Sequence, residues 1–62
     1  MNKEDIIIGT AVIYWTIIKD GRKLGKFETT IQSTPWMSGN NLVCIVKGKI
    51  APVLISNLEK KN

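Results

Sequence analysis

The side chains that most often carry out catalysis are scarce in this sequence. It contains no histidine, and therefore lacks both the commonest metal ligand and the side chain whose ordinary pKa lies nearest neutrality. Its single cysteine, Cys44, lies in an apolar run, which predicts a buried, reduced thiol. One cysteine is too few for a structural zinc site. The acidic residues are scattered without the spacing of a general acid–base pair. We expect no enzymatic activity, no metal site and no cofactor.

Basic side chains gather at two predicted turns. Nine Lys and Arg against five Asp and Glu give a net charge of +4, which favours anionic partners such as nucleic acid or an acidic protein surface. Lysines also keep sheet edges from pairing with other chains, so a solvated turn is the competing interpretation. The candidate binding residues are Lys19, Arg22, Lys23 and Lys26 around the first turn, and Lys47 and Lys49 around the second.

Aromatic residues supply two further candidates. Trp36 follows Pro35 in a polar segment, where an exposed indole could stack on a base or anchor a protein partner. A tryptophan folded back over the end of the domain is the alternative. Tyr14 and Trp15 are neighbours in a predicted strand, so they point to opposite faces. We assign Trp15 to the core and Tyr14 to the surface or to an interface.

Short runs of β-branched and aromatic residues separated by turn residues predict an all-β domain. The first strand covers residues 10–19, and Asp20-Gly21 predicts a tight two-residue hairpin turn after it. Gly25 marks a bulge or a bend in the second strand. The face of the first strand assigned to the core is the wholly apolar one, formed by Ala11, Ile13, Trp15 and Ile17.

The rest of the chain predicts three more strands. In the second strand polar and inward residues alternate, and the inward set is Phe27, Thr29 and Ile31. Residues 33–41 are interpreted as a loop, and residues 42–46 as a central strand because both faces are apolar. Residues 50–55 form the fourth strand, in which Pro52 indicates an edge or a bulge. Residues 58–60 form a short closing strand. Five short strands need closure to hide their edges, which favours a small, mostly antiparallel barrel.

The segment from Gly48 to Glu59, Gly-Lys-Ile-Ala-Pro-Val-Leu-Ile-Ser-Asn-Leu-Glu, resembles the end of SH3-like barrels. The resemblance implies a fourth strand, a single helical turn and a last strand, within a five-stranded SH3-like barrel. It does not imply binding of proline-rich ligands, because the acidic loop, the paired tyrosines and the tandem tryptophans of SH3 domains are missing.

One enzyme family of this fold class, the type II dihydrofolate reductases, lines its pore with a Val-Gln-Ile-Tyr strand. The segment Val53-Leu54-Ile55-Ser56 falls at the similar place and keeps Val and Ile. It lacks the Gln and Tyr that contact the ligands in that family, so reductase activity is not implied.

We interpret the 62 residues as one domain, with residues 1–4 and 60–62 frayed. No signal peptide and no apolar stretch of membrane-spanning length is visible, which predicts a cytoplasmic protein. Two functions stay open. The first is a nucleic-acid-associated binding module that uses the basic hairpin and surface aromatics. The second is a protein-interaction or regulatory module, an accessory protein of a phage or mobile element by analogy, that binds an acidic partner or self-assembles through the Tyr14 face or an open sheet edge.

Overall fold

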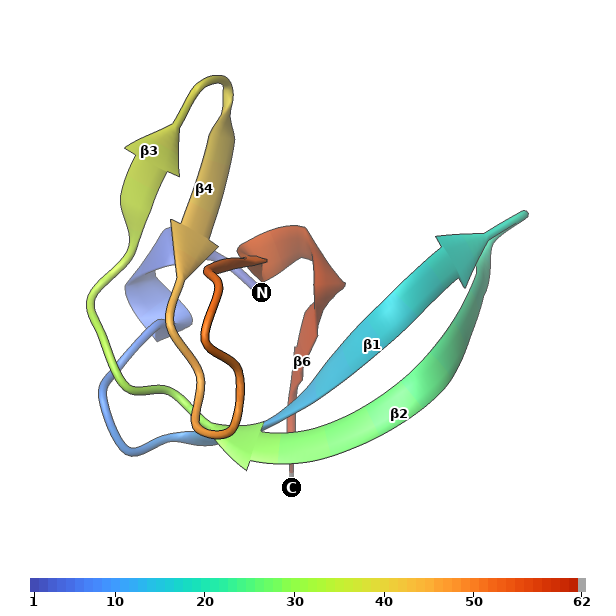
Figure 1. Cartoon of the computed structure of the whole chain (residues 1–62), viewed down its shortest axis with the longest axis horizontal. Coiled ribbons are helices and arrows are strands. Elements are labelled where there is room, and N and C mark those ends of the chain that lie inside the picture. The colour runs from blue at the N-terminus through green and yellow to red at the C-terminus, as the bar shows by residue number, and fades with distance from the viewer. Residues whose placement is uncertain (62) are drawn as a thin grey trace.

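The computed structural model describes residues 1–61, which form two three-stranded antiparallel sheets (Figure 1). The elements in chain order are η1 (Lys3–Asp5), β1 (Ala11–Lys19), β2 (Arg22–Thr30), β3 (Trp36–Ser38), β4 (Asn41–Cys44), β5 (Val53–Leu54), η2 (Ile55–Asn57) and β6 (Leu58–Lys60). The strand orders are β2-β1-β6 and β3-β4-β5. The all-β, antiparallel prediction is confirmed. However, residues 1–61 contain six strands, and within this part of the chain the two sheets do not close into one barrel.

The predicted Asp-Gly hairpin is confirmed. Lys19 pairs with Arg22 across a two-residue turn, and both turn residues have positive φ, 52° at Asp20 and 75° at Gly21. Two positive φ values give the turn the same twist as its flanking strands. Figure 1 shows the β1–β2 hairpin extending away from the body of the molecule, so its tip is far from the second sheet.

Gly25 bends β2 without adding a residue to it. The β1–β2 register is the same before and after this position, with Trp15 opposite Lys26 and Ile17 opposite Leu24, so there is no bulge. The φ of Gly25 is 70°, a value that other residues adopt at a cost. Figure 1 shows that β2 follows a curved course.

The core lies where the two sheets meet. Their connection is a single bridge between Ile31 and Val46, just beyond the ends of β2 and β4. Next to it, the Gln32 amide donates to the Ile45 carbonyl at 2.8 Å. The core residues are Ile6, Val12, Ile31, Cys44, Val46, Val53, Ile55 and Leu58. Because most are β-branched, the interior is filled by the residue types that favour strands.

The prediction of which β1 face is buried was wrong. Val12 is completely buried and Tyr14 packs against the core, whereas Ala11 is exposed and Ile17 is 52% exposed. Trp15 is half-buried but is not part of the core cluster. Both faces of β1 are apolar enough to be buried, so alternation alone could not identify the inner one. The approach of the second sheet and β6 decided it.

The predicted loop at residues 33–41 contains a strand. Trp36–Ser38 forms β3, which pairs with β4 through a turn made of Gly39 and Asn40. Gly-Asn between two pairing segments is itself a hairpin signal, and the polar residues around it concealed the strand. The prediction that β4 is central is confirmed, since it lies between β3 and β5.

The C-terminal segment has a shorter fourth strand than predicted. Only Val53–Leu54 pairs as β5, and Pro52 lies just before this edge strand, where a missing backbone donor costs no ladder bond. One 3₁₀ turn, η2, then leads into β6. Fraying of residues 1–4 and 60–61 stays a prediction, and residue 62 lies outside the described residues. Within residues 1–61, no helix has the length and hydropathy to cross a bilayer.

Candidate functional site

The tip of the β1–β2 hairpin carries two exposed cations. Lys19 and Arg22 face each other across the tight turn at the end of the two strands. Neither makes an ion pair among residues 1–61. Both side chains are therefore available to an anionic partner.

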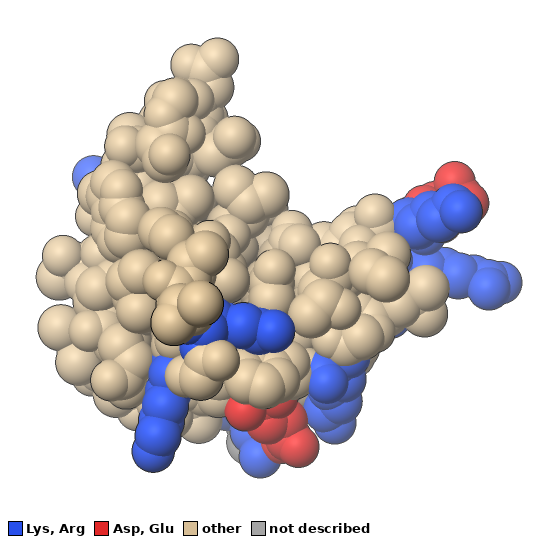
Figure 2. Space-filling view, viewed as in Figure 1, with Lys and Arg blue, Asp and Glu red and all other residues tan. Residues whose placement is uncertain are grey.

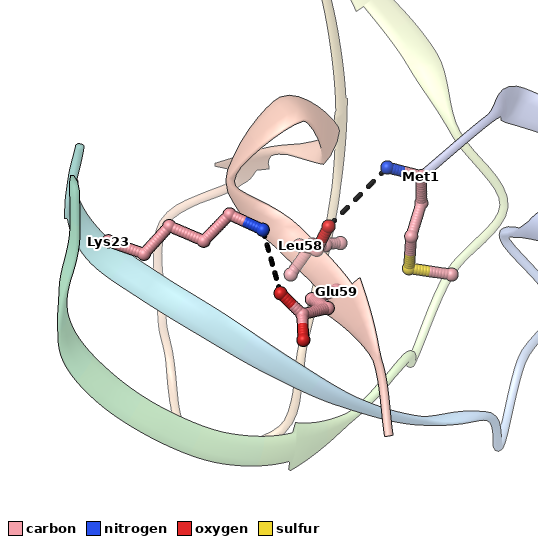
Figure 3. A network of polar contacts seen from close by, with 4 residues as sticks. All are labelled: Met1, Lys23, Leu58 and Glu59. Carbon is pink, nitrogen blue, oxygen red and sulfur yellow. Dashed lines mark hydrogen bonds and ion pairs between the residues drawn. The ribbon is translucent and has the colours of Figure 1, made fainter. Parts of the chain in front are cut away.

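Lys23, the next predicted binding residue, is already paired. Its Nζ lies 2.7 Å from Oε1 of Glu59, and the side chain reaches from β2 over β1 to β6 (Figure 3). Hydrogen bonding and charge attraction from Lys23 lower the pKa of the Glu59 carboxyl. In the same view the amino group of Met1 donates to the Leu58 carbonyl at 3.4 Å, which ties the start of the chain to β6. Glu59 was missed as a partner because 36 residues separate it from Lys23.

A second ion pair joins the end of the chain to β2. Lys61 contacts Glu28, and its hydrogen bond and charge lower the pKa of that carboxyl, with a smaller contribution from Lys26. Glu28 and Glu59 are thus both neutralised by lysines. Lys26, which has no ion pair of its own among residues 1–61, keeps an exposed charge.

The second basic turn rests on the middle of the β1–β2 sheet. Nζ of Lys49 lies 4.6 Å from the ring centre of Phe27 and 5.8 Å from that of Tyr14, so Lys49 makes cation–π contacts with both rings. Gly48 has a φ of 90°, and a Cβ at this position would lie 3.0 Å from the Phe27 ring. The Lys47 amide donates to the Thr30 carbonyl at 3.0 Å. The fold thereby brings Lys47, Lys49 and Tyr14 together beside β2.

Trp36 lies on a hairpin that contains no charged residue. It is 40% exposed on β3, and residues 29–46 contain no charged side chain. Figure 2 shows basic side chains at the tip of the β1–β2 hairpin, in the middle of the view and along its lower edge, and one at the left beside the β3–β4 hairpin. The residues of the β3–β4 hairpin itself carry no charge. The hairpin that carries Trp36 supplies no basic side chain of its own, and the combination of a basic turn with a stacking Trp36 stays a prediction.

Met37, which sequence analysis did not select, accompanies Trp36 on β3. Its side chain is 57% exposed. Trp36, Val43 and Leu54 lie opposite one another across β3, β4 and β5, so they form an apolar row on one face of this sheet. The hairpin turn at Gly39-Asn40 is the sequence signal that could have identified β3 and its exposed residues.

The reactive groups of the described chain are isolated. Cys44 is completely buried, and burial raises the pKa of its thiol. Among residues 1–61, no group of three Cys, Asp or Glu side chains is placed to hold a metal ion, and there is no pocket. The indole Nε1 of Trp15 is buried without a hydrogen-bond partner in this part of the chain. It adds slightly to the stabilisation of the Glu59 carboxylate, although its geometry falls short of a hydrogen bond.

Compared with known protein families, curated proteins and solved structures, the chain has no significant match in any of the three. The structure itself describes a small all-β domain of two antiparallel sheets with two projecting hairpins. The SH3-like resemblance of the C-terminal segment stays a prediction.

Proposed function

We propose that this protein is a non-enzymatic module that binds nucleic acid through the phosphate backbone. The binding surface is a basic band, defined as Lys19, Arg22, Lys26, Lys47 and Lys49. One observation carries the proposal. The two basic turns, separated in sequence, both lie against the stretch of β2 from Arg22 to Phe27, and none of the five cations makes an ion pair among residues 1–61.

The length of the basic band suits a phosphate backbone. The ammonium of Lys49 lies over the ring of Phe27, and Phe27 is five residues from Arg22 along β2. At the rise of an extended strand, these five residues span roughly 17 Å. Along one strand of a duplex, that distance holds about five phosphates. Because β2 is an edge strand, Arg22 and Lys49 can contact well-separated phosphates of a backbone that runs along this edge, although they lie toward opposite faces of the strand.

The proposed binding does not include base stacking by Trp36. That side chain belongs to the uncharged hairpin, and the Tyr14 and Phe27 rings are half-buried under the Lys49 ammonium. Backbone contacts alone carry little sequence information. We therefore expect similar affinity for oligonucleotides of different sequence.

The salt dependence of binding tests the proposal. Five phosphate contacts predict that log K falls against log salt concentration with a slope of about −4.5 for duplex DNA. Between about 50 and 200 mM salt, affinity should fall roughly 500-fold. The measurement is fluorescence anisotropy of labelled duplex and single-stranded oligonucleotides titrated with the protein. Absence of salt-dependent binding at micromolar protein would overturn the proposal.

A pair of variants with equal net charge separates the band from general attraction. Arg22→Gln combined with Lys26→Gln removes two charges from the band, and should reduce the slope to about −2.7. Lys3→Glu lowers the net charge by the same amount in η1, outside the band, and should leave the slope near its original value. Equal effects of the two variants would contradict the assignment. Equal binding to polyglutamate would favour an acidic protein partner.

A further inference from the structure

The edge strand β3 differs in charge from the edges formed by β2 and β6, and in length from β5, the other uncharged edge, which has two residues and directly follows Pro52. β3 lies at the end of the order β3-β4-β5, in the segment 29–46 that contains no charged residue. The opposite situation holds at β2, whose edge carries Arg22, Lys23 and Lys26, and at β6, which carries Glu59 and Lys60. Charged residues on an edge strand are a common protection against pairing with another chain. β3 lacks that protection.

The register shows which backbone groups of β3 face outward. Ser38 and Asn41 flank the two-residue turn and form a hydrogen-bonded pair, so the next pair, Met37 and Leu42, is a non-hydrogen-bonded one. The N–H and C=O of Met37 consequently point away from β4, toward the open edge. No other backbone group among residues 1–61 bonds to them. Met37 thus offers one donor and one acceptor beside an exposed apolar side chain.

We infer that β3 pairs with β3 of a second copy of this chain, as antiparallel strands related by a two-fold axis at Met37. In this arrangement the two Met37 residues exchange both hydrogen bonds, their side chains lie side by side on one face, and Trp36 of each copy lies opposite Ser38 of the other. The β3-β4-β5 sheet of one copy and that of the other then form one continuous six-stranded sheet.

Charge distribution selects a second copy as the occupant. Each chain has a net charge of +4, so two copies that approached through their basic edges would repel each other. At the β3 edge identical surfaces meet without opposing charges, and this edge is longer than the uncharged two-residue edge at β5. Because the β3 edge is uncharged, it has no charge that would attract an acidic or a basic partner. This inference is independent of nucleic-acid binding, because no residue of the basic band lies on β3.

Sedimentation velocity from micromolar to millimolar protein tests the inference. We expect the apparent mass to double as concentration rises, and Met37→Lys to keep the chain monomeric. The matched control is Ile50→Lys, which adds the same charge and removes an apolar side chain outside β3 that is more exposed than Met37. A monomer at all concentrations would overturn the inference, and so would equal effects of the two variants.

A disulfide variant gives a positive readout that does not depend on the fold tolerating a lysine. In a hydrogen-bonded antiparallel pair the Cα atoms lie about 5.5 Å apart, within the range that a disulfide spans. Met37→Cys should therefore form covalent dimers under mild oxidation with oxidised glutathione, while Ile50→Cys should form far fewer. The native Cys44 thiol is buried and does not compete. Equal cross-linking at both positions would indicate random collision and refute the pairing.

Discussion

Replacing Gly25 with alanine should destabilise the protein more than the same change at other glycines with positive φ. At Gly25 the φ is 70°, and an added Cβ would lie 1.8 Å from Oγ1 and 3.2 Å from Cβ of Thr16. At Gly21 the φ is 75°, but nothing lies within 4 Å of an added Cβ. The two positions share the conformational cost and differ in the steric one.

The magnitude follows from these two contributions. A left-handed conformation costs an alanine about 1–2 kcal/mol, partly offset by about 0.4–1 kcal/mol from the reduced freedom of the unfolded chain. The contact with Thr16 adds overpacking of about 1–3 kcal/mol. We expect Gly25→Ala to cost about 2–4 kcal/mol and Gly21→Ala about 1 kcal/mol. In a domain of this size, each kcal/mol lowers the Tm by roughly 4–8 °C.

Urea unfolding followed by tryptophan fluorescence measures the difference. Thr16→Ala removes Oγ1, which is the closest atom to the added Cβ, and its hydrogen bond to the Gly25 carbonyl. The penalty of Gly25→Ala should therefore shrink by about 1–2 kcal/mol in a Thr16→Ala background. Equal costs at Gly25 and Gly21, with no effect of Thr16→Ala, would refute the argument that the close approach of the two strands determines this glycine.

Two other predictions concern packing and charge. Ile31→Ala should lower the free energy of unfolding by about 2–5 kcal/mol because Ile31 is completely buried. Ile17→Ala, at an exposed position, should change it by no more than about 0.5 kcal/mol. Similar urea midpoints for the two variants would contradict the observed core. The pKa of Glu59 is lower in the folded chain than in the unfolded chain, so its contribution to stability is present above its ordinary pKa and is lost as pH falls through the folded value. Glu59→Gln should therefore reduce the loss of stability on acidification, which urea unfolding from neutral to acid pH measures. If the stability of the variant falls with pH as steeply as that of the original chain, the result would argue against the Lys23–Glu59 pair.

Local patterns predicted the parts of the fold that depend on neighbours in sequence. The Asp20-Gly21 turn and the central position of β4 are confirmed, because turn chemistry and side-chain period act over a few residues. The sequence also determined that charge is absent from residues 29–46 and concentrated elsewhere, which is a matter of composition.

Only the tertiary structure decided which apolar face of β1 is inside, because both faces have residues suited to burial and the packing of β6 and the second sheet selects Val12. It also decided the state of the candidate site. Lys23 forms an ion pair with Glu59, Lys49 lies over the Phe27 ring, and Trp36 lies on a separate hairpin. These outcomes depend on distances between segments that are far apart along the chain. Such distances are set by how the two sheets pack, which no local pattern of residues specifies.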